Sequence, residues 1–334
     1  MTFRKLTLVC LGLLLQCGLL MPAQAWDATS HRLSAYVAWE SLTPAHRARL
    51  VSILQQHPRY QEDFLDQMPA NVLVADQESQ ERWLLGQAAV WPDMARSFDG
   101  EAKIRYHRPD WHWIDGVWMR GEGLQGNVYV GVDPLPSIHA EALGPAQHEA
   151  AVDNVVLAIE YNATALQNPL NSAAEQAIAL CWLLHLVGDI HQPTHSGALI
   201  STTLFPHGDR GGNGITTRSG SLHAVWDEAL RNRPFDDTLR RMTSTLRQTD
   251  LEAVDMRIDT WLQESRIVMQ EFVYPDEVKA AVLRSERRHT QLPSFALDED
   301  YASGMQKIAE DRVTLAGIRL FLSLRRILNN WSLP

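Results

Sequence analysis

Cysteine is scarce in this chain, with three in 334 residues. Two of them, Cys10 and Cys17, lie in an N-terminal segment that we expect to be removed, so Cys181 would remain alone and no internal disulfide could form. The sequence also lacks internal repeats, low-complexity tracts and a linker that would divide it. These absences disfavour disulfide-stapled and repeat architectures. They favour one domain stabilised by packing and bound metal.

Positive charge is also in short supply, with 30 Lys and Arg against 40 Asp and Glu. Loss of Arg4 and Lys5 with the N-terminal segment would move the formal net charge from −10 to −12. Broad electrostatic adhesion to a polyanion depends on many basic side chains, so this balance argues against it. A nuclease is still allowed, because divalent ions can supply positive charge where a phosphate binds.

The first 25 residues have the pattern of a secretory signal peptide. Two basic residues precede an apolar run, and Ala23-Gln24-Ala25 satisfies the small-x-small rule for cleavage. The run is short and contains Gln16, which disfavours the alternative of a membrane anchor. We therefore expect a secreted or periplasmic protein without stable membrane association. Its signal peptide would span residues 1–25, and its mature domain residues 26–334.

Apolar residues recur at spacings of three and four along most of the chain, and strand-like alternation is scarce. This pattern predicts an all-α fold consisting of a single, mainly helical domain. Thr43 followed by Pro44 predicts a helix start. The predicted helices lie near residues 33–42, 44–55, 83–89, 145–166, 251–272 and 300–330. Residues 111–130 are expected to hold a short hairpin, and residues 196–221 a glycine-rich loop.

The segment 180–195 carries three histidines and an aspartate within its last eleven residues. His185 and Asp189 lie four apart on a predicted helix and therefore share a face, and Pro193 can turn His195 back toward that face. A lone histidine in an apolar helix is usually a core residue. Burying all these groups without a cation would cost several kcal/mol, so the segment predicts metal binding.

Other short segments offer further ligands. His223 and Asp227 again lie four apart, a pair that alone is equally typical of a helix salt bridge. Asp93 precedes Arg96 by three residues, and His112 precedes Asp115 by three. The ten candidate donors are the amine and carbonyl of Trp26 and the side chains of His31, Asp93, His112, His185, Asp189, His195, His223 and Asp227. One four-coordinate zinc ion cannot use ten donors, so the inventory predicts several ions.

In these motifs the chain resembles the S1/P1 type of fungal and plant single-strand nucleases, which share a trinuclear zinc fold with bacterial zinc phospholipase C. The matching motifs are Trp26 with His31, Trp91-x-Asp93-x-x-Arg96, His112-Trp113-x-Asp115, His185-x-x-Gly-Asp189-x-His-Gln-Pro-x-His195, the loop 208–213 and His223-x-x-Trp-Asp227. The resemblance extends to about Leu230 and is vague beyond.

The resemblance implies three Zn²⁺ ions. The first would be held by Asp93, His112, His185 and Asp189, the second by His195, His223 and Asp227, and the third by Trp26, His31 and Asp189. It also implies that the ions activate water for attack on phosphorus and that Arg96 stabilises phosphoryl charge. Trp113 would stack a base, Asp115 would bind the edge of that base, and Asn213 would contact the substrate. His191 would support the ligands without being one.

Some positions depart from the pattern of this family. Asp27 and Ser30 stand where it has glycines, and Ser221 where it usually has asparagine. Residues 56–87 look like an insertion that could reshape the rim of the cleft. These departures leave the expected metal ligands intact and affect the expected substrate contacts.

The resemblance implies a zinc endonuclease and 3′-nucleotidase that cuts single-stranded DNA or RNA to 5′-phosphorylated products, acting as a monomer without an obligate protein partner. The alternative is a zinc phospholipase C, but such lipases use His-x-x-x-Glu and a longer gap between the terminal tryptophan and the first histidine. A non-enzymatic, zinc-stabilised protein is disfavoured, because structural zinc sites usually have four protein ligands and the second site offers three.

Overall fold

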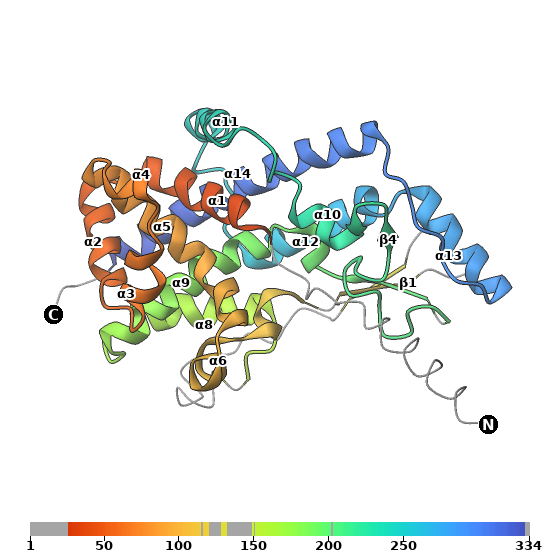
Figure 1. Ribbon diagram of the computed structural model, residues 1–334, viewed down its shortest axis with the longest axis horizontal. Helices are drawn as coiled ribbons and strands as arrows, with labels where there is room; N and C mark the ends of the chain where they lie inside the picture. The colour runs from red at the N-terminus through yellow and green to blue at the C-terminus, as the bar shows by residue number, and fades with distance from the viewer. Residues whose placement is uncertain are drawn as a thin grey trace, which may run out of the picture.

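Helices α1 (Ala28–Ser41), α5 (Gln77–Met94), α9 (Ala173–Asp189) and α14 (Glu299–Asn329) form the centre of the molecule (Figure 1). α1 packs against α14 and α5, and α9 packs against α5 and α8 (Val155–Gln167). Their facing side chains are apolar and buried, among them Trp39, Trp91 and Trp182. Burial of these side chains gives the fold one continuous core.

The computed structural model describes residues 26–114, 116–119, 128–131, 149, 151–201 and 203–330. The other helices are α2 (Pro44–Leu54), α3 (Tyr60–Asp63), α4 (Ala70–Leu73), α6 (Gly100–Tyr106), α10 (Leu222–Asp227), α11 (Phe235–Gln248), α12 (Ile258–Val268) and α13 (Asp276–Arg288). Short 3₁₀ turns are η1 (Leu65–Gln67), η2 (Ala95–Ser97), η3 (Pro109–His112) and η5 (Pro193–His195), and η6 (Met269–Val273) is a π-helix.

Local capping explains where several helices begin. Thr43 caps α2 by accepting a hydrogen bond from the backbone of His46, with Pro44 at the first helical position as predicted. α9 begins with a capping box, in which the Ser172 hydroxyl accepts from the Glu175 backbone and the Glu175 side chain accepts from the Ser172 backbone. The cap fixes the start of the helix that carries His185 and Asp189.

Strands are short and lie at one end of the helical core. β1 (Gly116–Met119) pairs antiparallel with β2 (Val128–Gly131) and parallel with β3 (Ala198–Ile200). β4 (Thr216–Thr217) pairs with β5 (Gly220–Ser221). The pairing of β1 with β2 confirms the predicted hairpin. β3 brings the chain after His195 beside the chain after His112.

The all-α class and the glycine-rich loop are confirmed, but two helix boundaries were predicted wrongly. Within the helix expected over 145–166, residues 151–154 are not helical, and α8 begins at Val155, because the Asn154 side chain accepts from the backbones of Val156 and Leu157 and caps the helix there. The helix expected over 251–272 begins at Ile258. Residues 251–257 form turns, in which the Asp250 and Asp255 carboxylates accept backbone hydrogen bonds from Glu252 and Arg257.

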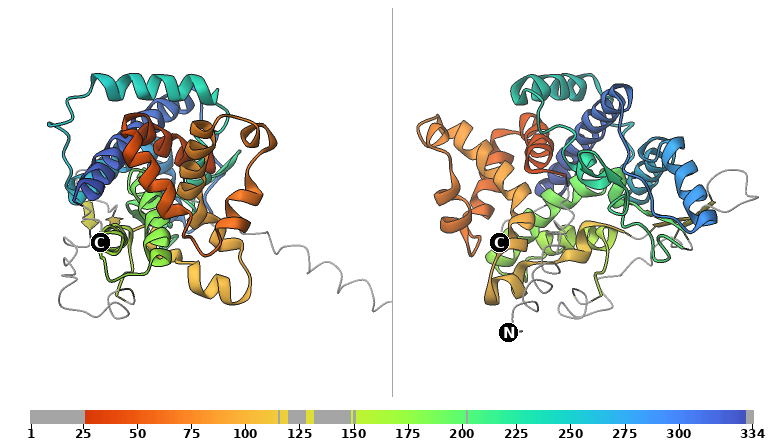
Figure 2. Two further views of the ribbon diagram at one scale, coloured as in Figure 1. Left: turned by 90° about the vertical axis from the view of Figure 1, so that its left-hand side faces the viewer. Right: turned by 45° about the vertical axis from the view of Figure 1, so that its right-hand side comes forward.

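The outer helices surround this core. α11 lies across α1 and α14, as both the contacts and Figure 2 show. The segment 56–87 forms α3, η1, α4 and the first part of α5, at the same end of the molecule as α2 (Figure 1). Among the residues described, no helix combines the length and the apolarity needed to cross a membrane.

Candidate metal centre

Asp189, the last residue of α9, is the hub of a cluster of buried polar side chains. Its Oδ1 lies 3.4 Å from Nε2 of His31, on α1. Its Oδ2 lies 3.0 Å from Nε2 of His185, one turn earlier on α9, and 3.0 Å from Nδ1 of His112, in η3. All four side chains are almost completely buried. Helix α9 therefore gathers ligand-type groups from three separate parts of the chain.

A second group forms where α5 ends beside α9. Oδ1 of Asp93 lies 3.8 Å from Nε2 of His185 and 3.9 Å from Nδ1 of His112, and those two nitrogens lie 2.9 Å apart. Asp93 also pairs with Nη2 of Arg96 at 2.7 Å. Two imidazole nitrogens that face each other this closely need a proton or a cation between them.

A third group joins η5 to α10. Oδ2 of Asp227 lies 3.4 Å from Nε2 of His223, and Oδ1 lies 4.0 Å from Nε2 of His195. The two imidazole rings are stacked with centroids 5.1 Å apart. Nδ1 of His195 also lies 3.8 Å from Oδ1 of Asp189, so this group adjoins the first.

Backbone carbonyls orient three of these histidines. Nδ1–H of His185 donates to the carbonyl of Ala89 at 2.8 Å, that of His195 donates to His112 at 2.7 Å, and that of His223 donates to Gly211 at 2.9 Å. Each bond leaves Nε2 as the acceptor nitrogen facing the carboxylates. Outer hydrogen bonds of this kind are typical of metal-ligating histidines, because they fix the tautomer and the ring orientation.

Burial sets the protonation states of the cluster in the absence of an ion. It lowers the pKa of His112 to about 4 and also lowers the pKa of His31 and His195, which keeps these rings in the neutral, metal-binding form. Burial opposes the ionisation of Asp189, yet His185 and the hydrogen bonds from its neighbours hold its pKa well below the usual range.

Asp227 responds in the opposite direction. Burial raises its pKa well above the ordinary value, and the hydrogen bond from Gln192 compensates only in part. A neighbouring divalent cation would favour the carboxylate form at this position. The third group therefore contains a buried carboxyl group whose ionised form a bound cation would stabilise.

Two glycines allow the close approaches that assemble the site. A Cβ on Gly188 would lie 2.8 Å from Nδ1 of His31. A Cβ on Gly211, which has a φ of +60°, would lie 2.0 Å from the carbonyl oxygen of Thr194. The glycine-rich loop can therefore pack against the segment before His195, and only then does the Gly211 carbonyl reach His223.

The donor set fits a cluster of divalent ions. Three groups of imidazole and carboxylate donors each bring their ligand atoms within 4.8 Å of one another: His31, His185 and Asp189; Asp93, His112 and His185; and His195, His223 and Asp227. Among the described residues, Oδ1 of Asp189, Oδ2 of Asp227 and both ring nitrogens of His31 have no hydrogen-bond partner. Leaving such atoms buried and unpaired costs about 1–3 kcal/mol each, and a cation would satisfy them.

Of the remaining residues expected at the site, Trp26 and Trp113 adjoin residues of the cluster, and Asn213 lies on the loop that packs against it. Trp26 is buried, and the backbone N–H of Asp27 donates to the carbonyl of Asp227 at 3.1 Å, so the start of the described chain is tied to the third group. Trp113 directly follows His112, and its side chain is 38% exposed. Asn213 lies on the glycine-rich loop, with its amide donating to the Arg210 carbonyl. Asp115 lies outside the described residues.

The unusual residues at the expected glycine and asparagine positions have structural roles. Asp27 caps α1 by accepting from the backbone of Ser30 and also pairs with Arg231. Ser221 caps α10 by accepting from the backbone of Ala224, and its hydroxyl lies 3.4 Å from Oδ1 of Asn213. Both residues therefore cap helices that carry candidate ligands.

Several supporting residues were missed from the sequence. Oδ2 of Asp63, in the segment 56–87, accepts from Nε1 of Trp91 at 2.8 Å, two residues before Asp93. Gln192 donates to Oδ1 of Asp227 at 2.7 Å. Only Gln192 carried a signal, its place between two candidate histidines, because Asp63 has no informative neighbour in the sequence.

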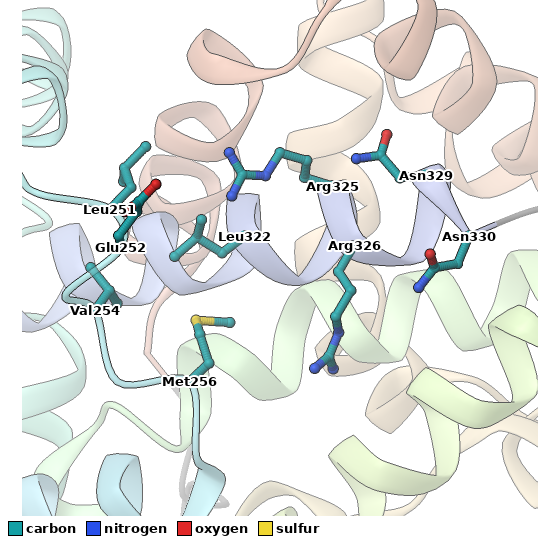
Figure 3. A pocket seen from close by; sticks show the side chains of 9 residues that line it. All are labelled: Leu251, Glu252, Val254, Met256, Leu322, Arg325, Arg326, Asn329 and Asn330. Carbon is teal, nitrogen blue, oxygen red and sulfur yellow. The ribbon is translucent and has the colours of Figure 1, made fainter.

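One surface cavity lies away from this cluster. It has a volume of about 410 Å³ and is lined by residues of the 251–256 turns and the last turns of α14, including Leu251, Met256, Leu322, Arg325 and Arg326 (Figure 3). Its arginines lie at the C-terminal end of α14, where cations complement the helix dipole. No candidate ligand of the buried cluster lines this cavity.

The helical fold and the three buried donor groups define a helical protein whose core can hold several metal ions. The sequence model of the S1/P1 Nuclease family matches residues 26–329. The chain therefore belongs to the S1/P1 nuclease family, as predicted.

Curated relatives from Arabidopsis thaliana support the same assignment. The chain is 30% identical to Endonuclease 4 over 162 residues, which are 46% of this chain and 51% of the relative. It is 26% identical to Endonuclease 5 over 159 residues, or 45% and 50% of the two chains, and 26% identical to Endonuclease 2 over 158 residues, or 45% and 51%. The chain thus spans about half the length of the curated relatives it matches.

Proposed function

We propose that this protein is a zinc-dependent nuclease whose mature domain, residues 26–334, begins at Trp26 after removal of a signal peptide. The observation that carries the proposal is the set of three adjoining groups of buried or half-buried histidine and aspartate side chains, which are linked through His185 and through the contact of His195 with Asp189. The family match beginning at residue 26 supports the same boundary. Export as a secreted or periplasmic protein follows from the signal peptide.

Three zinc ions are assigned to the donor groups. Asp93, His112, His185 and Asp189 would hold the first, and His195, His223 and Asp227 the second. Trp26, through its amine and carbonyl, would hold the third with His31 and Asp189. Support for the last assignment comes from the contact between His31 and Asp189 and from the short path between Trp26 and the backbone of Asp227.

The chemistry divides between the ions and the chain. Bound zinc would lower the pKa of water and screen the charge of the phosphodiester. Arg96 would donate to the phosphoryl oxygens, and its contact with Asp93 holds the guanidinium at the edge of the cluster. Gln192 keeps the Asp227 carboxylate directed at His195 and His223.

Trp113 supports a preference for unpaired strands. Its backbone is fixed on both sides, because its carbonyl accepts from Val155 N–H at 3.0 Å and the next N–H, of Ile114, donates to the His195 carbonyl at 2.9 Å. The indole remains partly exposed beside the buried cluster. A base can stack on such a ring only when it is not already stacked in a duplex. Asp115 and Asn213 would bind the edge of that base and the sugar–phosphate backbone.

The experiment measures the release of acid-soluble nucleotides from single-stranded DNA, single-stranded RNA and duplex DNA, together with release of phosphate from a 3′-nucleotide. We expect 5′-phosphorylated products and a clear preference for single strands. Phosphocholine release from lecithin is measured in parallel, because turnover of lipid alone would reject the nuclease in favour of a phospholipase C.

A substitution separates base stacking from metal binding. Trp113→Ala should raise KM for single-stranded DNA about tenfold, since one stacked base contributes roughly 1–3 kcal/mol, while the zinc content stays unchanged. The matched control is Leu170→Ala, which removes an exposed apolar side chain away from the cluster and should leave KM unchanged. An unchanged KM in the Trp113 variant would refute the stacking role.

A further inference from the structure

Two arginines of α14 are buried beneath the candidate metal centre. Arg312 and Arg319 are 6% and 2% exposed. Arginine is rarely so buried, because removing its charge from water is costly unless a counter-charge and hydrogen bonds replace the solvent. Their partners therefore show what the burial accomplishes.

Glu264 of α12 supplies the counter-charge. Its Oε2 accepts from Nη1 of Arg312 at 2.8 Å and from Nη1 of Arg319 at 2.6 Å, and its Oε1 accepts from Nη2 of Arg319 at 2.7 Å. The Arg319 guanidinium also lies 5.3 Å from the ring centroid of Trp261, which, like Glu264, belongs to α12. One carboxylate thus holds both arginines in fixed orientations.

The remaining donors of the arginines point at the turn that follows Asp189. Nη1 of Arg319 donates to Nε2 of His191 at 2.8 Å, and Nε of Arg312 donates to the carbonyl of the same residue at 3.2 Å. The Ser265 hydroxyl accepts from Nη2 of Arg312 and donates to the carbonyl of Ile190 at 2.6 Å. The turn is therefore held at three points by α12 and α14.

The two ring nitrogens of His191 have different hydrogen-bond roles. Its Nδ1–H donates to the carbonyl of Val187 at 2.7 Å, so Nε2 has a lone pair for Arg319. A neutral ring that accepts from an arginine serves as a spacer between α14 and α9.

Both ends of the turn reach candidate ligands. Asp189 immediately precedes Ile190, and the side chain of Gln192 donates to Asp227. His195 lies three residues further on, in η5. A shift of this turn would therefore move Asp189, in the first donor group, relative to His195 and Asp227 in the third.

We infer that Arg319, Arg312 and Glu264 are positioning residues that fix the turn 190–192 and so hold the zinc ligands at their mutual distances. They act through His191 and Gln192. The inference rests on the metal-binding part of the proposed function. It gives the C-terminal part of the chain, where the sequence motifs are absent, a defined role in the centre.

The test compares zinc binding with folding. Arg319→Gln removes the charge and the donor to His191, and we expect zinc affinity, measured by competition with a chelator of known affinity, to fall about tenfold. The rise in Tm that zinc produces over protein in EDTA should shrink. Arg319→Lys retains the charge and one donor and should restore part of the affinity.

The matched control is Arg241→Gln. Arg241 makes a bidentate ion pair with Glu310 of α14, with both hydrogen bonds 2.7 Å long. No hydrogen bond connects this pair to the turn 190–192. This variant should lower Tm slightly and equally with and without zinc. If Arg319→Gln also lowers Tm by the same amount with and without zinc, and its zinc affinity is unchanged, then the arginines only stabilise the fold.

A milder variant keeps the inference testable if Arg319→Gln fails to fold. Ser265→Ala deletes one hydroxyl that bonds the Ile190 carbonyl, and it should weaken zinc binding in the same direction by a smaller factor. Unchanged affinity in this variant would contradict the inference. A wild-type protein that binds no zinc would instead overturn the proposed function itself, so the two failures are distinguishable.

Discussion

The imidazole rings of His31 and His185 stack with their centroids 3.9 Å apart and their planes at 19°. One ring comes from the first turn of α1 and the other from the last turn of α9, and both Nε2 atoms face Asp189. Two imidazole rings bring no charge of opposite sign to this contact. Their common direction toward Asp189 brings the first turn of α1 beside the cluster.

The first prediction concerns the proposed start of the mature chain. A protein with one extra residue before Trp26 should lose most of its nuclease activity and about one zinc ion per chain, because its amine would be displaced from the third site. Activity on single-stranded DNA and metal analysis of the two forms provide the measurement. Equal activity and equal zinc content would show that the terminus is not a ligand.

The second prediction concerns Asp189, which is shared by two of the proposed sites. Asp189→Asn should abolish hydrolysis and lower the zinc content, since a neutral amide is a poor bridge between cations. The matched control is Asp237→Asn, an exposed carboxylate paired with Arg240 on α11, which should keep full activity. Full activity with full metal loading in the Asp189 variant would exclude the bridge.

The third prediction uses two glycines with similar backbone angles. Gly211→Ala should destabilise the protein by about 2 kcal/mol more than Gly100→Ala, because a Cβ at Gly211 meets the Thr194 carbonyl, whereas at Gly100, with a φ of +55°, it meets nothing within 4 Å. The comparison cancels the strain of a positive φ. Thermal unfolding of both variants measures the difference, and equal losses would show that the loop relaxes freely.

The fourth prediction concerns pH. Burial raises the pKa of Asp209 to about 6, and its carboxylate accepts from the Tyr274 hydroxyl at 2.8 Å. The folded state therefore holds this proton more tightly than the unfolded state, whose carboxyl titrates near 3.8. The corresponding stability is present below about pH 4 and is lost, up to about 3 kcal/mol, as the pH rises through 6.

Asp209→Asn removes this titration. The free energy of unfolding of the variant should fall less steeply than that of the wild type between pH 4 and pH 7. Denaturant unfolding at a series of pH values, with zinc held constant, tests this directly. Parallel curves for the two proteins would show that the carboxyl has no raised pKa in the folded state.

The candidate ligands could be predicted from the sequence because most lie in short motifs with a helical spacing. His185 and Asp189 share one face of α9, but the helix ends at Asp189, before Pro193, which instead begins the 3₁₀ turn that carries His195. The supporting residues could not be found in this way. Arg319 lies 128 positions from His191, and no spacing rule connects residues that meet only through the packing of α14 against α9.

The fold was predicted best where apolar periodicity is long. Helix α14 has nearly the predicted bounds, whereas the helix predicted over 145–166 is not helical at residues 151–154, because the Asn154 side chain caps a helix that starts at Val155. In residues 251–257 the spacing of Leu251 and Val254 imitates a helix. Hydrogen bonds from the backbone to aspartate side chains stabilise turns there instead, and such local competition is not visible in periodicity.

Metal analysis of the exported protein, read beside its intact mass, tests the central claim most directly. The account predicts a chain that begins at Trp26 and carries three zinc ions. Removal of the ions by a chelator should abolish cleavage of single-stranded DNA, and added zinc should restore it. A protein that starts at Trp26, holds no zinc and still cuts single-stranded DNA in the presence of the chelator would contradict the account.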